Sequence, residues 1–135
     1  MDKIIWKIEY SVGVKEIDEQ HQHFFSVLNE LYISQYANKE KEWMLHIFEQ
    51  LDGYIRFHFA TEEKYFDEIK YEYSDQHKKS HHEFINKIES LKQGFEDGKT
   101  NVAESLATYL EDWFVNHIDK ADKKYTDIFH KNNIY

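Results

Sequence analysis

The sequence contains no cysteine, no proline and only four glycines in 135 residues. Without cysteine the chain has no disulfide, no thiolate metal ligand and no cysteine nucleophile, so a transition-metal site would have to use imidazole and carboxylate groups. This composition fits a reducing compartment without requiring one. Because proline is the residue that most strongly interrupts a helix, its absence favours long unbroken helices.

Long apolar runs are also missing. No stretch approaches the roughly 20 apolar residues that cross a membrane, and residues 1–6 are too short and too charged for a signal peptide. We therefore expect a cytoplasmic protein with no membrane span. The net charge of -9, with lysines scattered among acidic residues, repels phosphate backbones, so we expect no nucleic-acid partner.

Four segments carry apolar residues in alternating steps of three and four, which keeps these side chains on one face of a helix. We expect helices over about residues 18–37, 40–66, 73–95 and 101–118, and a short tail helix over about 123–130. Apolar and polar residues alternate in residues 1–17, which predicts an extended arm. The 135 residues fit a single domain, and helices of this length with short loops favour an all-α fold, an antiparallel up-down-up-down four-helix bundle.

The ends of two helices carry recognisable signals. Asp18 precedes the first apolar stripe and is the expected N-cap of the first helix. Gly94 and Gly98 mark the end of the third helix, and Asn101 with Glu104 has the spacing of a capping box for the fourth.

Imidazole and carboxylate groups replace apolar residues on the inward stripes of all four helices. They fall at the start of the first helix, the end of the second, the start of the third and the end of the fourth: His21, His58, Glu62, His77, His81 and His117. In an antiparallel bundle these places lie at the same end. Burying such groups without partners costs roughly several kcal/mol, so their convergence predicts a metal site.

Single motifs within this set are weak, because about half of one His-x-x-x-His pair is expected by chance in such a histidine-rich chain. The prediction rests on the convergence of two inward-facing pairs with two further histidines. Asp122 follows His117 by five residues, which on a continuous α-helix places it about 140° away. Spacing alone leaves two readings open: the helix breaks and Asp122 is a ligand, or Asp122 lies on the surface.

Over essentially its whole length the sequence resembles the hemerythrins, in particular their bacterial single-domain members. The resemblance lies in residues 12–14 and 17–21, in the HFATEE segment at 58–63, in HKKSH at 77–81, and in WFVNH at 113–117 followed by Asp122. It implies a centre of two iron ions, in which one iron takes His77, His81 and His117, the other takes His21 and His58, and Glu62 and Asp122 bridge them. The resemblance also selects iron, since the ligand types alone would suit zinc, and manganese is a further alternative.

Five histidines, two bridging carboxylates and one shared oxo or hydroxo group fill all but one position of two octahedral ions. The resemblance places dioxygen at the open position and implies reversible oxygen binding, for storage, delivery or scavenging. We expect a monomer without enzymatic activity. Two alternatives are oxygen or redox sensing, and an enzyme acting on peroxide or nitric oxide. The enzyme would need a proton donor near the open iron, and no inward-facing acid, lysine or histidine beyond the ligands is apparent in the sequence.

Four apolar residues lie within one helical turn of proposed ligands and are candidates for the lining of the oxygen pocket, although plain core packing explains them equally well: Phe24, Phe25, Ile55 and Trp113. The other histidines fall off the inward stripes and are expected at the surface: His23, His46, His82 and His130. Glu63 is expected to point to solvent. Four tyrosines could hydrogen-bond to ligands, and the sequence does not choose among them: Tyr54, Tyr65, Tyr109 and Tyr125.

Overall fold

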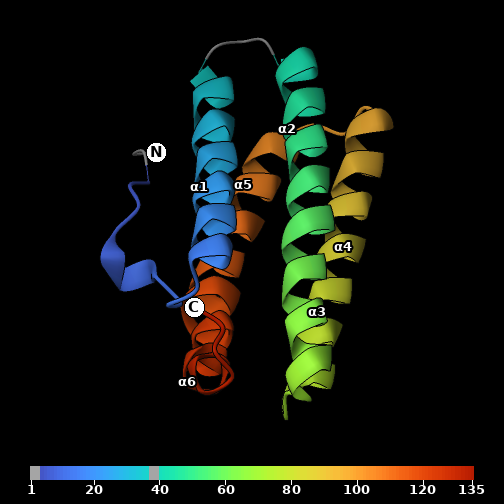
Figure 1. Ribbon diagram of the computed structural model, residues 1–135. Helices are drawn as coiled ribbons and strands as arrows, with labels where there is room; N and C mark the ends of the chain where they lie inside the picture. Colours follow the sequence, from blue (N-terminus) through green and yellow to red (C-terminus); the bar gives the residue numbers. More distant parts are fainter. Residues whose placement is uncertain (1–3, 37–39) are drawn as a thin grey trace.

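The computed structural model describes residues 4–36 and 40–135, and this part of the chain is helical with no strand (Figure 1). The first long rod is α1 (Lys15–Tyr36), and the second joins α2 (Glu40–Tyr54), the π-helical segment η2 (Ile55–Phe59) and α3 (Ala60–Ile69). The third is α4 (Ser74–Glu96), and the fourth joins α5 (Val102–Trp113) to the π-helical η3 (Phe114–Ala121). Shorter elements are the 3-10 turns η1 (Ile8–Tyr10) and η4 (Asp122–Tyr125), and the tail helix α6 (Thr126–Lys131).

The rods form the antiparallel four-helix bundle that the sequence predicts. Successive rods run in opposite directions, with α1 packed against α2 and α5, and α4 packed against α3 and α5 (Figure 1). Within the described residues, no helix is long and apolar enough to cross a membrane. Residues 37–39, where the first helix was expected to end, and residues 1–3 of the arm lie outside the described residues.

The predicted start of the first helix is wrong by three residues. Helix α1 begins at Lys15, and the carboxylate of Asp18 accepts hydrogen bonds from the Ser11 hydroxyl and, at 2.9 Å, from the Val12 amide. Asp18 therefore holds the arm against the helix instead of capping its N-terminus. The arm is also not fully extended, because residues Ile8–Tyr10 form a 3-10 turn.

The predicted capping box at Asn101 is wrong as well. Asn101 does precede α5, but its backbone is left-handed, with φ of 62°, and its side chain makes no capping hydrogen bond. The cause is the tight connection from α4, in which Gly98 also has a positive φ of 82°. The role of Gly98 as a stop is confirmed, since α4 ends at Glu96, but the same prediction for Gly94 is wrong, because Gly94 lies inside α4.

Buried apolar residues form two separate clusters. The larger fills most of the bundle and includes Phe24, Leu28, Leu51, Phe84 and Leu110. The smaller closes the end of the bundle and draws on the arm, the start of α1, the end of the second rod and the tail: Val12, Val14, Ile17, Phe66, Tyr71, Tyr125 and Phe129. The arm and tail thus complete a second core that the four rods alone would leave open.

Three side chains from the tail hold the arm over this end. The Thr126 hydroxyl donates to the Val12 carbonyl at 2.6 Å, the His130 Nε2–H donates to the Gly13 carbonyl at 2.8 Å, and the Lys123 ammonium donates to the Glu9 carbonyl. Two partly buried carbonyls of the arm, those of Val12 and Gly13, thereby gain partners.

Gly13→Ala should destabilise the protein. Gly13 has φ of +74°, and an added Cβ would lie 2.9 Å from the His130 ring and 3.0 Å from Thr126 Cγ2. The left-handed backbone alone should cost about 1–2 kcal/mol. Urea unfolding would measure the loss.

Gly53→Ala is the matched control. Gly53 lies inside α2 with nothing within 4 Å of an added Cβ, so alanine should raise the stability by up to about 1 kcal/mol through its helix propensity. Equal stabilities of the two variants would contradict this account of the arm.

Candidate metal centre

The seven residues singled out in the sequence come together in one buried layer. Each has at most 5% of its surface exposed, and they come from α1, η2, α3, α4, η3 and η4: His21, His58, Glu62, His77, His81, His117 and Asp122. Their candidate ligand atoms form two groups, each lying within 4.8 Å. One group is His21, His58 and Asp122, and the other is Glu62, His77, His81 and His117.

The carboxylate of Asp122 faces both groups. Its Oδ2 lies 2.9 Å from Nε2 of His21 and 3.6 Å from Nε2 of His58. Its Oδ1 lies 2.9 Å from Nε2 of His77 and 3.0 Å from Nε2 of His117. One side chain therefore presents one oxygen to each half of the layer.

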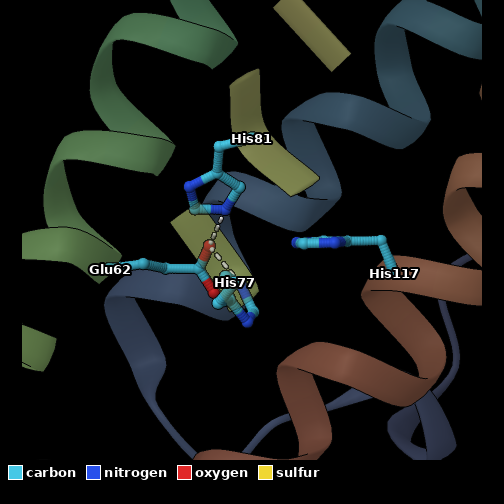
Figure 2. A group of neighbouring side chains, drawn as sticks. All are labelled: Glu62, His77, His81 and His117. Atoms are coloured by element: carbon cyan, nitrogen blue, oxygen red, sulfur yellow. Dashed lines mark hydrogen bonds and ion pairs between the residues drawn. The ribbon is translucent and has the colours of Figure 1, made fainter. Parts of the chain in front are cut away.

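Glu62 also reaches both halves, through a single oxygen. Its Oε1 lies 3.2 Å from Nε2 of His58, 3.3 Å from that of His77 and 3.0 Å from that of His81. Figure 2 shows Glu62 extending between His81 and His77, with the edge of the His117 ring directed toward the same space from the opposite side.

The π-helical segment η3 explains how Asp122 reaches the layer. Spacing on an α-helix turns Asp122 away from His117, but residues 114–121 wind as a π-helix, with hydrogen bonds between residues five apart. Residues 117 and 122 are themselves five apart, so the wider winding brings them to the same side. The chain therefore neither breaks after His117, as one reading had it, nor places Asp122 on the surface, as the other had it.

The nitrogen and oxygen atoms of the layer are better placed to bind a metal ion than to hydrogen-bond to one another. Nε2 of His58, Nε2 of His117 and Oδ1 of Asp122 are buried and make no hydrogen bond of proper geometry within the described residues, although they lie close together. Buried polar atoms without partners are rare and costly. Imidazole nitrogens and carboxylate oxygens converging in this way are the ligands that transition-metal ions take in proteins.

The match to known proteins covers this layer and the bundle around it. Residues 12–128 match the family described as the hemerythrin HHE cation binding domain. The chain belongs to the hemerythrin family. A bacteriohemerythrin from Pseudomonas aeruginosa is 32% identical over 127 residues, which cover 94% of this chain and 82% of that protein. A bacteriohemerythrin from Clostridium acetobutylicum is 28% identical, over 91% of this chain and 98% of that protein.

Solved hemerythrins have the same fold. The crystal structure of a wild-type hemerythrin superposes with a TM-score of 0.80 at 28% sequence identity, over 93% of this chain and 97% of that one. A hemerythrin variant in which one leucine is replaced by tyrosine gives the same TM-score at 29% identity, over 94% of this chain and 97% of that one. The bundle and its HHE cation-binding domain are therefore shared with the family.

The pKa values of the two carboxylates in the layer are lowered, so both groups are anionic. Their negative charge favours the protonated form of two histidines. Burial and the charge of Asp122 act to raise the pKa of Glu62, but His58 and His77 outweigh them and hold it well below its usual range. The pKa of Asp122 is also well below its usual range, because His117, His21 and His58 outweigh the effect of burial.

The histidines respond unequally. Burial acts to lower the pKa of His58 and of His77, but the carboxylates of Glu62 and Asp122 outweigh it and raise these pKa values to about 9 and about 10. Burial dominates at His117 and lowers its pKa. A metal ion that takes His58 and His77 as ligands must therefore displace a proton from each.

Aromatic rings line the layer on both sides. Trp113 stacks on His117 with centroids 3.9 Å apart, and Phe59 stacks on His81 at 3.7 Å. Tyr54 stacks on His58 at 4.9 Å, and the edge of Phe66, from the smaller cluster, meets His77 at 4.8 Å. The layer lies between the two apolar clusters, which separate it from water.

Of the four residues expected to line the pocket, Trp113 contacts a histidine of the layer through its ring. Phe24 packs against Tyr54, which in turn stacks on His58, and the ring centroids of Phe24 and Tyr54 are 5.3 Å apart. Phe25 packs against Trp6, Tyr10 and Phe114 near the arm, and Ile55 is partly buried against the larger cluster.

Sequence reasoning missed Phe59 and Phe66 as walls. It named Tyr54 only as a possible hydrogen-bonding partner. Tyr54 precedes His58 by four residues, so its position could have been found from helical spacing. Phe59, the neighbour of His58, could not, because α-helical geometry turns it about 100° away.

The outward nitrogens of two histidines also have partners that were not predicted. Nδ1 of His58 lies 2.8 Å from Oε1 of Gln20, and Nδ1 of His81 lies 2.9 Å from Oε2 of Glu63. The prediction that Glu63 points to solvent is therefore wrong, although its side chain is about 34% exposed. Capturing the outer nitrogen of a ligand histidine is a common feature of metal sites.

The other histidines follow the prediction with one exception. His23, His46 and His82 are exposed. His130 is partly buried, because its ring reaches under the arm to the Gly13 carbonyl and stacks with Tyr135.

Raising the pH should destabilise the metal-free protein. The pKa values of His58 and His77 are higher in the folded protein than the usual 6.5, so the stability that they add is complete below pH 6.5 and is lost as the pH rises through about 9 and 10. The melting temperature, followed by circular dichroism, should fall between pH 7 and pH 10.

His58→Gln is the control for this prediction, because glutamine is polar but does not titrate. Its melting temperature should fall less over the same pH range, which separates the layer from lysines and tyrosines that also titrate at high pH. Parallel curves for wild type and His58→Gln would contradict the assignment.

Proposed function

We propose that this hemerythrin binds dioxygen reversibly at a centre of two iron ions. The observation that carries the proposal is the position of Asp122, whose two oxygens each face a different set of histidines at 2.9–3.6 Å. A carboxylate placed in this way suits a bridge between two ions. A single ion would not need the second set.

The distances support the same division of ligands that the family resemblance implies. His77, His81 and His117 would hold one ion, His21 and His58 would hold the other, and Glu62 and Asp122 would be shared. The position with two histidines then has fewer protein ligands and is the one left open to dioxygen. Two ferrous ions would supply the two electrons that dioxygen takes up on binding.

The protein's own contribution is to keep water and protons away from the ions. The ligands are nearly fully buried, and four aromatic rings cover the imidazoles. Exclusion of water limits side reactions such as proton leakage. This setting favours release of the oxygen unchanged.

Two buried phenols bear on the enzymatic alternative, in which peroxide or nitric oxide is reduced. Tyr54 and Tyr125 are almost fully buried beside the layer, and each phenol carries a proton. Burial, with the negative charges of Asp122 and Glu62, raises the pKa of both phenols well above the usual value of 10. Both phenols are therefore neutral at physiological pH in the metal-free protein.

The cytoplasmic location, the single domain over residues 1–135 and the monomeric state stay predictions from the sequence. Storage, delivery and scavenging of oxygen all fit the proposed chemistry.

The visible absorption spectrum tests the proposal. Protein purified with iron and reduced without air should gain an absorption band on exposure to oxygen and lose it when oxygen is removed. An irreversible change to a ferric spectrum would favour an enzyme or a sensor. No oxygen-dependent band, with zinc found by elemental analysis, would exclude the two-iron centre.

Metal content tests the ligand assignment. Wild-type protein should hold about two iron ions per chain, because the candidate ligand atoms form two groups, one in each half of the layer. His58→Ala and His77→Ala should each lower the iron content measured by elemental analysis, by about half or more. His82→Ala is the matched control, since His82 is exposed next to His81 on α4. Wild-type iron content in His58→Ala and His77→Ala would refute the assignment.

A further inference from the structure

The outward faces of His58 and His81 are held by groups of different charge. His58 meets the neutral amide of Gln20, and His81 meets the carboxylate of Glu63, both at Nδ1 and at 2.8–2.9 Å. In each ring Nε2 faces the buried layer. The two rings belong to different halves of the layer, so the difference in charge falls between the halves.

A directional chain of hydrogen bonds fixes the tautomer of His58. The backbone carbonyl of Phe57 can only accept, so the Thr61 hydroxyl donates to it, at 2.8 Å. The Thr61 oxygen then accepts from the Gln20 amide nitrogen at 2.9 Å. This orientation leaves the Gln20 oxygen facing His58, whose Nδ1 must carry the proton. Once the second proton of His58 is displaced, as metal binding requires, its lone pair is therefore at Nε2, directed inward.

Glu63 fixes the tautomer of His81 directly, through a single hydrogen bond. An ionised carboxylate only accepts hydrogen bonds, so Nδ1 of His81 must donate, and its lone pair is also at Nε2. A carboxylate bound to the outer nitrogen makes an imidazole a stronger donor to a metal than an amide does. His81 is thus held by an anionic group where His58 is held by a neutral one.

We infer that Gln20, Thr61 and Glu63 are positioning residues that orient His58 and His81 for metal binding and make the two metal positions unequal. At the two-histidine position, the outer nitrogen of His58 is bound by the neutral amide of Gln20, which is itself bound by the neutral hydroxyl of Thr61. At the three-histidine position, the outer nitrogen of His81 is bound by the anionic Glu63. Higher positive charge on the metal is favoured at the latter. The inference rests on the proposed two-metal centre.

Thr61→Val tests the relay. Valine has nearly the shape of threonine but lacks the hydroxyl, so the Gln20 amide is free to turn and His58 loses its fixed tautomer. Titration of the metal-free protein with cobalt(II), followed by visible absorption, should show about 10–100-fold weaker binding at one of two sites. Thr61→Ser restores the hydroxyl and should restore the affinity.

Glu63→Gln tests the effect of charge, because glutamine keeps an acceptor oxygen of the same reach. The midpoint potential of the iron-loaded protein should rise, since the ferric charge loses a nearby anion. Glu68→Gln is the matched control: it makes the same charge change at an exposed position of α3 and should leave the potential unchanged.

Three results would overturn the inference. The first is wild-type cobalt affinity in Thr61→Val, the second is loss of affinity that Thr61→Ser fails to restore, and the third is an equal shift of potential in Glu63→Gln and Glu68→Gln. If the wild-type protein still binds two cobalt ions in these cases, the proposed function stands. A wild-type protein that binds no cobalt would overturn both.

Discussion

The sharing of two buried carboxylates among five histidines is the interaction on which the rest of this hemerythrin depends. Asp122 gives one oxygen to each half of the layer, and Glu62 directs one oxygen to three imidazoles. Such groups are costly to bury unless they are paired or bind metal. The bundle must therefore hold them close enough to satisfy one another and still leave lone pairs for an ion.

The second apolar cluster follows from this requirement. A polar layer at the open end of four helices would be exposed to solvent, and water would screen its charges. The arm and tail close that end with Val12, Val14, Tyr125 and Phe129, and the bonds from Thr126 and His130 to the arm hold the closure in place. Segments that look peripheral in the sequence are therefore part of the wall of the site.

Much of this arrangement was predictable because the α-helical period is regular. The four rods, their directions and the convergence of six ligands follow from residues spaced three and four apart. Asp122 and Phe59 could not be placed in that way, because each depends on a π-helical segment that has no clear signal in the sequence. Asp18 and Asn101 show a second limit: a good capping residue was used for a tertiary contact in one case, and sat in a left-handed turn in the other.

The two π-helical segments do more than bring ligands into line. In an α-helix consecutive residues point about 100° apart, so a ligand's neighbour is turned away from the site. In η2 the neighbours His58 and Phe59 both face the layer, one toward Glu62 and the other stacked on His81. In the fourth rod, Trp113, the last residue of α5, covers His117 of η3, and Asp122, directly after η3, meets the same ring. Segment η2 thus supplies both a candidate ligand and the apolar surface beside it, and η3 supplies His117 and brings Asp122 to it. A return to regular α-helical winding would turn Asp122 or Phe59 away, so the convergence of the candidate ligands and the exclusion of water depend on the same departure from regular structure.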